Sequence, residues 1–148
     1  MALVLVFLTT RPQSRRFAPG SCGPTSLYAL CRQLGISVRF DDLLARFGDQ
    51  KEEADFVQIQ QVAATLNVSL EAREMTPETL KQLHAPGILH LDGNHFVAAL
   101  DYTECGVRIA DPINGGKSCV SIWTYPELCA HWDGRILILK AASAQNRF

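Results

Sequence analysis

Cys22 is the residue of this chain best placed for covalent chemistry, because it stands where a turn opens into a helix. Pro24 suits a first helical turn, and apolar residues then recur at helical spacing until Gly35. These residues are Leu27, Leu30, Cys31 and Leu34. A thiol at a helix N-terminus lies at the positive end of the helix dipole, which stabilises the thiolate that attacks carbonyl carbon. A nucleophile of this kind also needs a base and a carboxylate that orients the base.

A predicted β-hairpin supplies both groups. Residues 93–101 and 105–111 are typical of short buried strands, with the loop 102–104 between them. If the turn is centred on Thr103, the numbers of facing residues sum to 206. Side chains alternate across a strand, so the pairs formed by odd-numbered residues, such as Val97 with Ile109, share one face.

In that register His95 faces Asp111. Directly opposed residues have Cβ atoms about 4.5–5.5 Å apart, within reach of an imidazole–carboxylate hydrogen bond. We expect Pro112 to end the second strand and leave the carboxylate at the end of the sheet. Cysteine, histidine and aspartate together follow the logic of covalent acyl transfer.

The chain resembles peptidase family C39, from Gln13 to Lys140, in its length and in the order of its elements. The matching segments are Cys22-Gly23-Pro24 at a helix start, His95-Phe96-Val97-Ala98 on a strand, and Ala110-Asp111-Pro112. The resemblance implies a papain-like α+β fold, with N-terminal helices packed on an antiparallel sheet. It makes Cys22 the nucleophile, His95 the general base and Asp111 the group that orients His95. Relatives of this type precede bacteriocin-exporting ABC transporters and cut leader peptides after a double glycine.

The chain departs from this family before the nucleophile. C39 domains usually carry a glutamine, which stabilises the oxyanion, six residues before the cysteine, and Arg16 occupies that position here. Gln13 is the nearest candidate, and it can serve only if the segment between it and Cys22 loops out. The backbone N–H of Cys22 can supply half of an oxyanion hole. Loss of a side-chain donor costs about 10²–10³ in rate.

The amino-acid composition is that of one globular domain, which we place at residues 1–148. Within it, residues 1–12 form an apolar N-terminal segment to which we assign no role. The formal net charge of −1 gives no general attraction to nucleic acid. Residues 2–8 are apolar but too few to span a membrane. We expect a cytoplasmic location or the cytoplasmic face of a membrane, with secretion as the alternative if residues 2–8 belong to a signal peptide.

The remaining cysteines and histidines are expected to be structural. Five cysteines without Cys-x-x-Cys spacing favour neither a disulfide framework nor a zinc site, so we expect no metal or cofactor. The four other than Cys22 are interpreted as small buried hydrophobes. The other histidines lack metal-ligand spacing and are expected to be structural or solvent-facing. They are His84, His90 and His131.

The other elements follow from caps and periodicity. We expect a helix capped by Asp41, a helix at 54–66, and one from Pro77 to His84 capped by Thr76. Tyr125 to Trp132 is predicted as the last helix. Further strands are predicted at 68–72, 87–91, 118–122 and 135–139.

We therefore predict a cysteine endopeptidase, and the resemblance implies that it cuts a leader peptide after small residues such as Gly-Gly. Its expected partners are the peptide and, by the resemblance, a transporter or secretion partner. One alternative is a peptide-binding module of the same fold with little or no activity, which Arg16 favours. The other is an acyltransferase of the phytochelatin synthase type, although such relatives generally place the histidine further from the cysteine than the 73 positions that separate Cys22 from His95 here.

Overall fold

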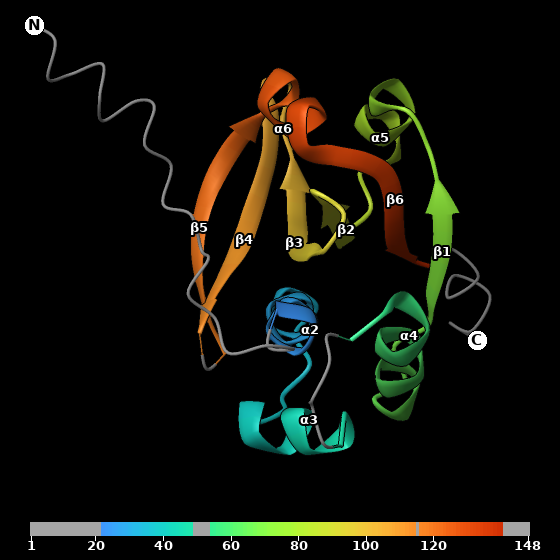
Figure 1. The fold of residues 1–148 in the computed structure, drawn as a ribbon, viewed down its shortest axis with the longest axis vertical. Helices are drawn as coiled ribbons and strands as arrows, with labels where there is room; N and C mark the ends of the chain where they lie inside the picture. Colours follow the sequence, from blue (N-terminus) through green and yellow to red (C-terminus); the bar gives the residue numbers. More distant parts are fainter. Residues whose placement is uncertain (1–21, 49–53, 115, 141–148) are drawn as a thin grey trace, which may run out of the picture.

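The computed structural model describes residues 22–48, 54–114 and 116–140. One sheet, ordered β1-β6-β2-β3-β4-β5, has only antiparallel neighbours (Figure 1). Its strands are β1 (Leu70–Glu74), β2 (Gly87–Leu91), β3 (His95–Tyr102), β4 (Gly106–Asn114), β5 (Lys117–Thr124) and β6 (Trp132–Leu139). The helices are α2 (Cys22–Gln33), α3 (Phe40–Arg46), α4 (Phe56–Thr65), α5 (Pro77–Leu83) and α6 (Tyr125–His131). The predicted α+β class, with N-terminal helices packed on an antiparallel sheet, is confirmed.

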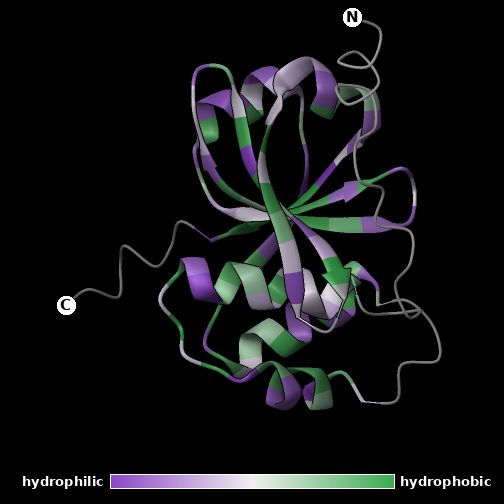
Figure 2. Ribbon diagram, turned by 90° about the vertical axis from the view of Figure 1, so that its left-hand side faces the viewer, coloured by the Kyte–Doolittle hydropathy of each residue, from purple (hydrophilic) through white to green (hydrophobic). Residues whose placement is uncertain are grey.

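The sheet separates two hydrophobic cores, because successive strand residues point to opposite faces. On β3, Phe96 packs with the core that contains α2 and α4, whereas Val97 packs with the core that contains α5 and α6. Ile88 and Leu89 divide in the same way on β2. Figure 2 shows the α2–α4 helices grouped on one side of the strands, with hydrophobic segments in both layers.

Helix α2 ends as its sequence predicts. Gly35 adopts φ +75°, and its N–H donates to the carbonyl of Arg32 while the N–H of Ile36 donates to that of Cys31. This pair of hydrogen bonds is a Schellman motif, which needs a left-handed residue that glycine adopts without strain.

Several local predictions are wrong at element ends, and the strand predicted at 135–139 begins three residues earlier, at Trp132. Asp41 does not cap α3, because Arg39 occupies the N-cap and Asp41 lies within the first turn. The strand predicted at 68–72 begins two residues later, at Leu70. The N–H of Val68 donates to the carbonyl of Ala63, so residue 68 is still part of the end of α4. Thr76 caps α5 as expected, by accepting from the N–H of Thr79.

Among the helices of residues 22–48, 54–114 and 116–140, none is long and apolar enough to cross a membrane.

Candidate active site

Cys22 is the first residue of α2 and is 5% exposed. The helix reaches this position by a close approach to Ala54, the residue that leads into α4. A Cβ built on Gly23 would lie 3.0 Å from the Cβ of Ala54 and 3.4 Å from Cδ1 of Ile59. Glycine after the cysteine therefore lets the first turn of α2 pack tightly, which sets the position of the thiol.

His95 and Asp111 meet across β3 and β4. Nε2 of His95 lies 2.7 Å from Oδ1 of Asp111, and the two side chains are 20% and 12% exposed. Since a carboxylate oxygen accepts, Nε2 carries the proton and donates it. The hydrogen bond thus fixes the orientation of the imidazole ring.

The predicted register of this hairpin is wrong by two residues. Ala99 pairs with Ile109, not with Val107, and a bulge between Ala99 and Asp101 shifts the ladder further toward the turn. Continued toward Asp111, this register places the carboxylate diagonally from His95. Because an error of two residues preserves the face of every side chain, the hydrogen bond still forms.

Pro112 does not end the second strand as predicted. Strand β4 continues to Asn114, and Pro112 pairs with Ser118 of β5. A bulge follows between Pro112 and Asn114. Proline is tolerated at a bulge, where the ladder does not need its missing N–H.

His95 also hydrogen-bonds Cys22, which joins the three candidate residues into one chain. Burial alone would lower the pKa of His95. The hydrogen bonds and electrostatic interactions with Asp111 and Cys22 outweigh burial and raise that pKa from 6.5 to about 9. At neutral pH the imidazole is therefore protonated. Such an arrangement can hold a thiolate beside an imidazolium, and the imidazolium can then protonate a leaving group.

The oxyanion candidate Gln13 and the departing residue Arg16 lie outside the described residues. The structure does describe Cys22, whose N–H is one of the first four of α2. Those N–H groups have no acceptor inside a helix.

The other cysteines differ in exposure. Cys31 is buried as predicted, Cys119 is intermediate, and Cys105 and Cys129 are exposed, so the prediction of burial is wrong for those two. None of the five cysteines forms a disulfide. In the part of the chain that the structure describes, no group of three or more histidine, cysteine or acidic side chains is arranged to hold a metal ion.

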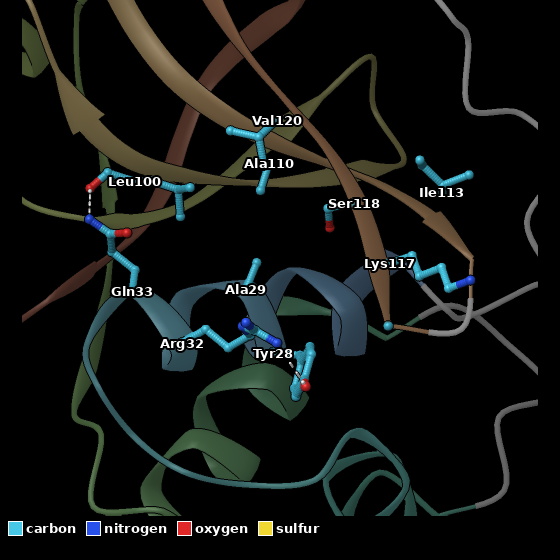
Figure 3. Close-up of a pocket in the computed structure, with 11 residues that line it drawn as sticks. Tyr28, Ala29, Arg32, Gln33, Leu100, Ala110, Ile113, Lys117, Ser118 and Val120 are labelled. Atoms are coloured by element: carbon cyan, nitrogen blue, oxygen red, sulfur yellow. Dashed lines mark hydrogen bonds between the residues drawn. The ribbon is translucent and has the colours of Figure 1, made fainter.

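A groove of about 670 Å³ runs between the flank of α2 and strands β3 to β5 (Figure 3). Sequence reasoning missed this groove. Helix α2 contributes Tyr28, Ala29, Arg32 and Gln33, and the strands and the β4–β5 turn contribute Leu100, Ala110, Ile113, Gly116, Lys117, Ser118 and Val120. Its walls include two cations and no carboxylate. Val120 is 50% exposed, and the alternation of apolar Val120 and Ile122 on an edge strand was the signal in the sequence.

None of Cys22, His95 and Asp111 lines the groove. Ala110 in its wall directly precedes Asp111, and Tyr28 lies less than two helical turns after Cys22. At one end Nε2 of Gln33 donates to the carbonyl of Leu100 at 3.4 Å. The lining of the groove combines apolar side chains with Arg32 and Lys117.

The model of the peptidase C39 family matches residues 12–144. A comparison with curated proteins found no match. A double glycine motif protease from an AMS/PCAT transporter, solved with a leader peptide, is similar at a TM-score of 0.70 and 22% identity, over 80% of this chain and 83% of that one. The peptidase domain of Streptococcus ComA, a bifunctional ABC transporter of a quorum-sensing pathway, is similar at a TM-score of 0.66 and 18% identity. The match covers 80% of this chain and 89% of that domain. The N-terminal C39-like domain of a toxin secretion ATP-binding protein from Vibrio parahaemolyticus has a TM-score of 0.66 and 15% identity. That match covers 80% of this chain and 95% of the other. At these identities the solved structures establish the fold alone.

Proposed function

This chain belongs to the peptidase C39 family, and we propose that it is a cysteine endopeptidase that cleaves a leader peptide after small residues such as Gly-Gly. The observation that carries the proposal is the position of His95, which hydrogen-bonds Asp111 at 2.7 Å and also hydrogen-bonds Cys22. The family match supports peptidase chemistry, and the arrangement of these side chains supports the assignment of roles.

In the first half of the reaction, the Cys22 thiolate attacks the scissile carbonyl carbon and forms a bond from Sγ. The tetrahedral oxyanion accepts from the N–H of Cys22 and, in this proposal, from Gln13. When the C–N bond breaks, the His95 imidazolium gives its proton to the departing amine. The product is a thioester between the substrate acyl group and Cys22.

In the second half, neutral His95 takes a proton from water, and the resulting hydroxide attacks the thioester carbonyl. The C–S bond breaks, the carboxylic acid product leaves, and the thiolate remains beside the protonated imidazole. Asp111 accepts from Nε2 throughout, which leaves Nδ1 for Cys22 and stabilises the imidazolium.

The groove between α2 and β5 supports an extended substrate. We place the leader segment there, with its apolar side chains on Leu100, Ala110 and Val120 and acidic side chains toward Arg32 and Lys117. A solved relative is described in complex with a leader peptide, and another as part of a bifunctional ABC transporter. By analogy, a transporter or secretion partner supplies the substrate.

The test incubates the purified protein with synthetic leader peptides that end in Gly-Gly, Gly-Ala or a bulkier pair before a short cargo. Mass spectrometry is expected to find cleavage after the small pairs and none with Cys22→Ala. A thioester on Cys22 should be trapped from the wild-type protein at acidic pH. Cleavage that survives in Cys22→Ala would contradict the proposal.

The second candidate is a peptide-binding module without turnover, favoured by Arg16 at the position where the family usually carries glutamine. A thiol-reactive probe separates the two functions. In an enzyme, Cys22 reacts faster than the exposed Cys105 and Cys129 although it is buried. In a binding module, the buried Cys22 is the slowest of the three.

A further inference from the structure

Two histidine-x-aspartate triplets lie antiparallel to each other where β2, the neighbour of the strand that carries His95, pairs with β6. They are His90-Leu91-Asp92, which runs from β2 into the next turn, and His131-Trp132-Asp133, which joins α6 to β6. Nδ1 of His90 lies 2.6 Å from Oδ2 of Asp133, and Nδ1 of His131 lies 3.0 Å from Oδ1 of Asp92. The histidine of each triplet thus hydrogen-bonds the aspartate of the other. We call these two contacts the His–Asp brace.

The brace depends on a local irregularity of the sheet. Leu91 pairs with Trp132, but Leu89 pairs with Ile136, so the ladder between β2 and β6 shifts by two residues. Gly134 lies in the shifted segment with φ +92°, a conformation that a side chain would strain. This bulge lets the segment around Asp133 reach His90 instead of continuing a regular ladder.

One half of the brace holds the turn just before His95. Asp92 has φ +51°, and its N–H donates to the carbonyl of His131 at 2.8 Å. The turn closes when the N–H of Asn94 donates to the carbonyl of Leu91 at 3.1 Å. His131 therefore holds Asp92 through both backbone and side chain, three residues before the candidate base.

The other half of the brace contacts the residue just after His95. The ring of His90 lies 5.1 Å from the ring of Phe96 and 5.7 Å from that of Phe56, between centroids. Phe56 and Phe96 also contact each other at 5.4 Å. The bond from Asp133 fixes the His90 ring, and the ring in turn supports Phe96.

We propose that the His–Asp brace positions His95 for its reaction with Cys22. His90, Asp92, His131 and Asp133 are positioning residues, because they act on the turn before His95 and on the Phe96 side chain after it, and not on the substrate. The inference rests on the proposed function, in which His95 is the base. The side chains of His131 and Asp92 are 46% and 57% exposed, and exposed polar pairs add little to stability, so loss of this half of the brace is expected to affect geometry more than folding. A displacement of about 1 Å at a reacting group can cost about 10²-fold in rate.

The main variant is His90→Phe/His131→Phe, which keeps both rings and removes both imidazole nitrogens. The rate of Cys22 alkylation by iodoacetamide is followed across pH by mass spectrometry of the Cys22 peptide, with Cys105 and Cys129 as internal reference thiols. We expect the rate at neutral pH to fall about tenfold or more. With a leader peptide, kcat should fall while KM stays within about twofold.

Two further variants make the test specific. His90→Asn/His131→Asn places an amide nitrogen near each lost Nδ1, so it is expected to restore part of the rate. Asp101→Asn removes the ion pair with Arg108 at the opposite end of β3 and should leave the rate unchanged. If the double phenylalanine variant fails to fold, the single variant His131→Phe is used instead. The side chains of His131 and Asp92 are 46% and 57% exposed, so this substitution is expected to be tolerated.

A folded brace variant whose alkylation rate and pH profile match the wild type overturns the inference. An equal loss in Asp101→Asn overturns it as well, because the effect is then a general one. His95→Ala in the same assay tests the proposed function separately. If only His95→Ala slows alkylation, the brace fails and the proposed function stands. If His95→Ala alkylates like the wild type, both fail.

Discussion

Nε2 of His95 lies 2.7 Å from Oδ1 of Asp111, although the two residues are diagonal in the β3–β4 hairpin and not opposite each other. The contact is possible because both side chains belong to the same face of the sheet and a histidine is long enough to bridge a diagonal. Asp111 thereby fixes the orientation of the imidazole ring, which also hydrogen-bonds Cys22.

Asp111→Ala is expected to reduce kcat by about 10²-fold or more, because the imidazole loses the group that orients it and stabilises its charge. Asp111→Asn should retain more activity, since its amide oxygen can still accept from Nε2. The measurement is kcat on a leader peptide for both variants. Equal losses in the two variants would show that charge, and not orientation, is the contribution of Asp111.

The stability of the protein is expected to decrease as the pH rises toward 9. The pKa of His95 is raised to about 9, so the folded state keeps a proton that the unfolded chain releases near pH 6.5. The contribution of this proton is complete below about pH 6.5 and is lost as the pH rises through about 9. Its size is at most ~3 kcal/mol.

Urea unfolding of the wild-type protein and His95→Gln, between about pH 6 and pH 10, measures this contribution. The difference in free energy of unfolding between the two proteins should shrink as pH rises. A difference that is the same at both ends of the range would contradict a charged His95 in the folded state.

Gly23→Ala is expected to lower activity although alanine favours helices over glycine. The new Cβ would lie 3.0 Å from the Cβ of Ala54, so Ala54 and the first turn of α2 must separate by a few tenths of an ångström, and Cys22 shifts with that turn. We expect kcat to fall by about tenfold or more. Gly23→Ala/Ala54→Gly removes the conflicting methyl group and should recover much of the loss. A double variant as impaired as the single one would point to a cause other than this contact.

Val120→Asp is expected to raise the KM of a long leader peptide by about tenfold. The new carboxylate lies in the apolar wall of the groove, and a bound peptide would bury it without a partner. A short peptide that spans only the cleavage site should be cut as before. Ile122→Asp is the matched control, since Ile122 is also exposed on β5 but does not line the groove. If both variants have the same effect on KM, the groove is not where the leader segment binds.

Much of the fold was predictable from local sequence. The end of α2 at Gly35 and the cap of α5 by Thr76 depend on residues a few positions apart, and both predictions are confirmed. Strand β2 was predicted with its observed bounds, Gly87–Leu91. Buried strands and amphipathic helices reveal themselves by the period of their apolar residues.

The predictions were wrong where contacts between residues far apart in the sequence determine the structure. The register of the β3–β4 hairpin depends on a bulge between Ala99 and Asp101, which simple counting from a turn does not foresee. Cys105 and Cys129 were expected to be buried because cysteine usually is. Their exposure depends on which elements cover them, and local sequence does not specify that.

The sequence by itself determined the residue types, the helix that begins at Cys22 and the face of the sheet that His95 shares with Asp111. Alternation along a strand preserves that face through an error of two residues, so the pairing of these two groups was recoverable without the register. Only the tertiary structure decided that His95 meets Cys22, that a groove opens beside α2, and that two histidine-x-aspartate triplets hold the turn before His95. These relationships join segments far apart in the chain, and packing of helices on the sheet and bulges in its ladders set them, not local periodicity.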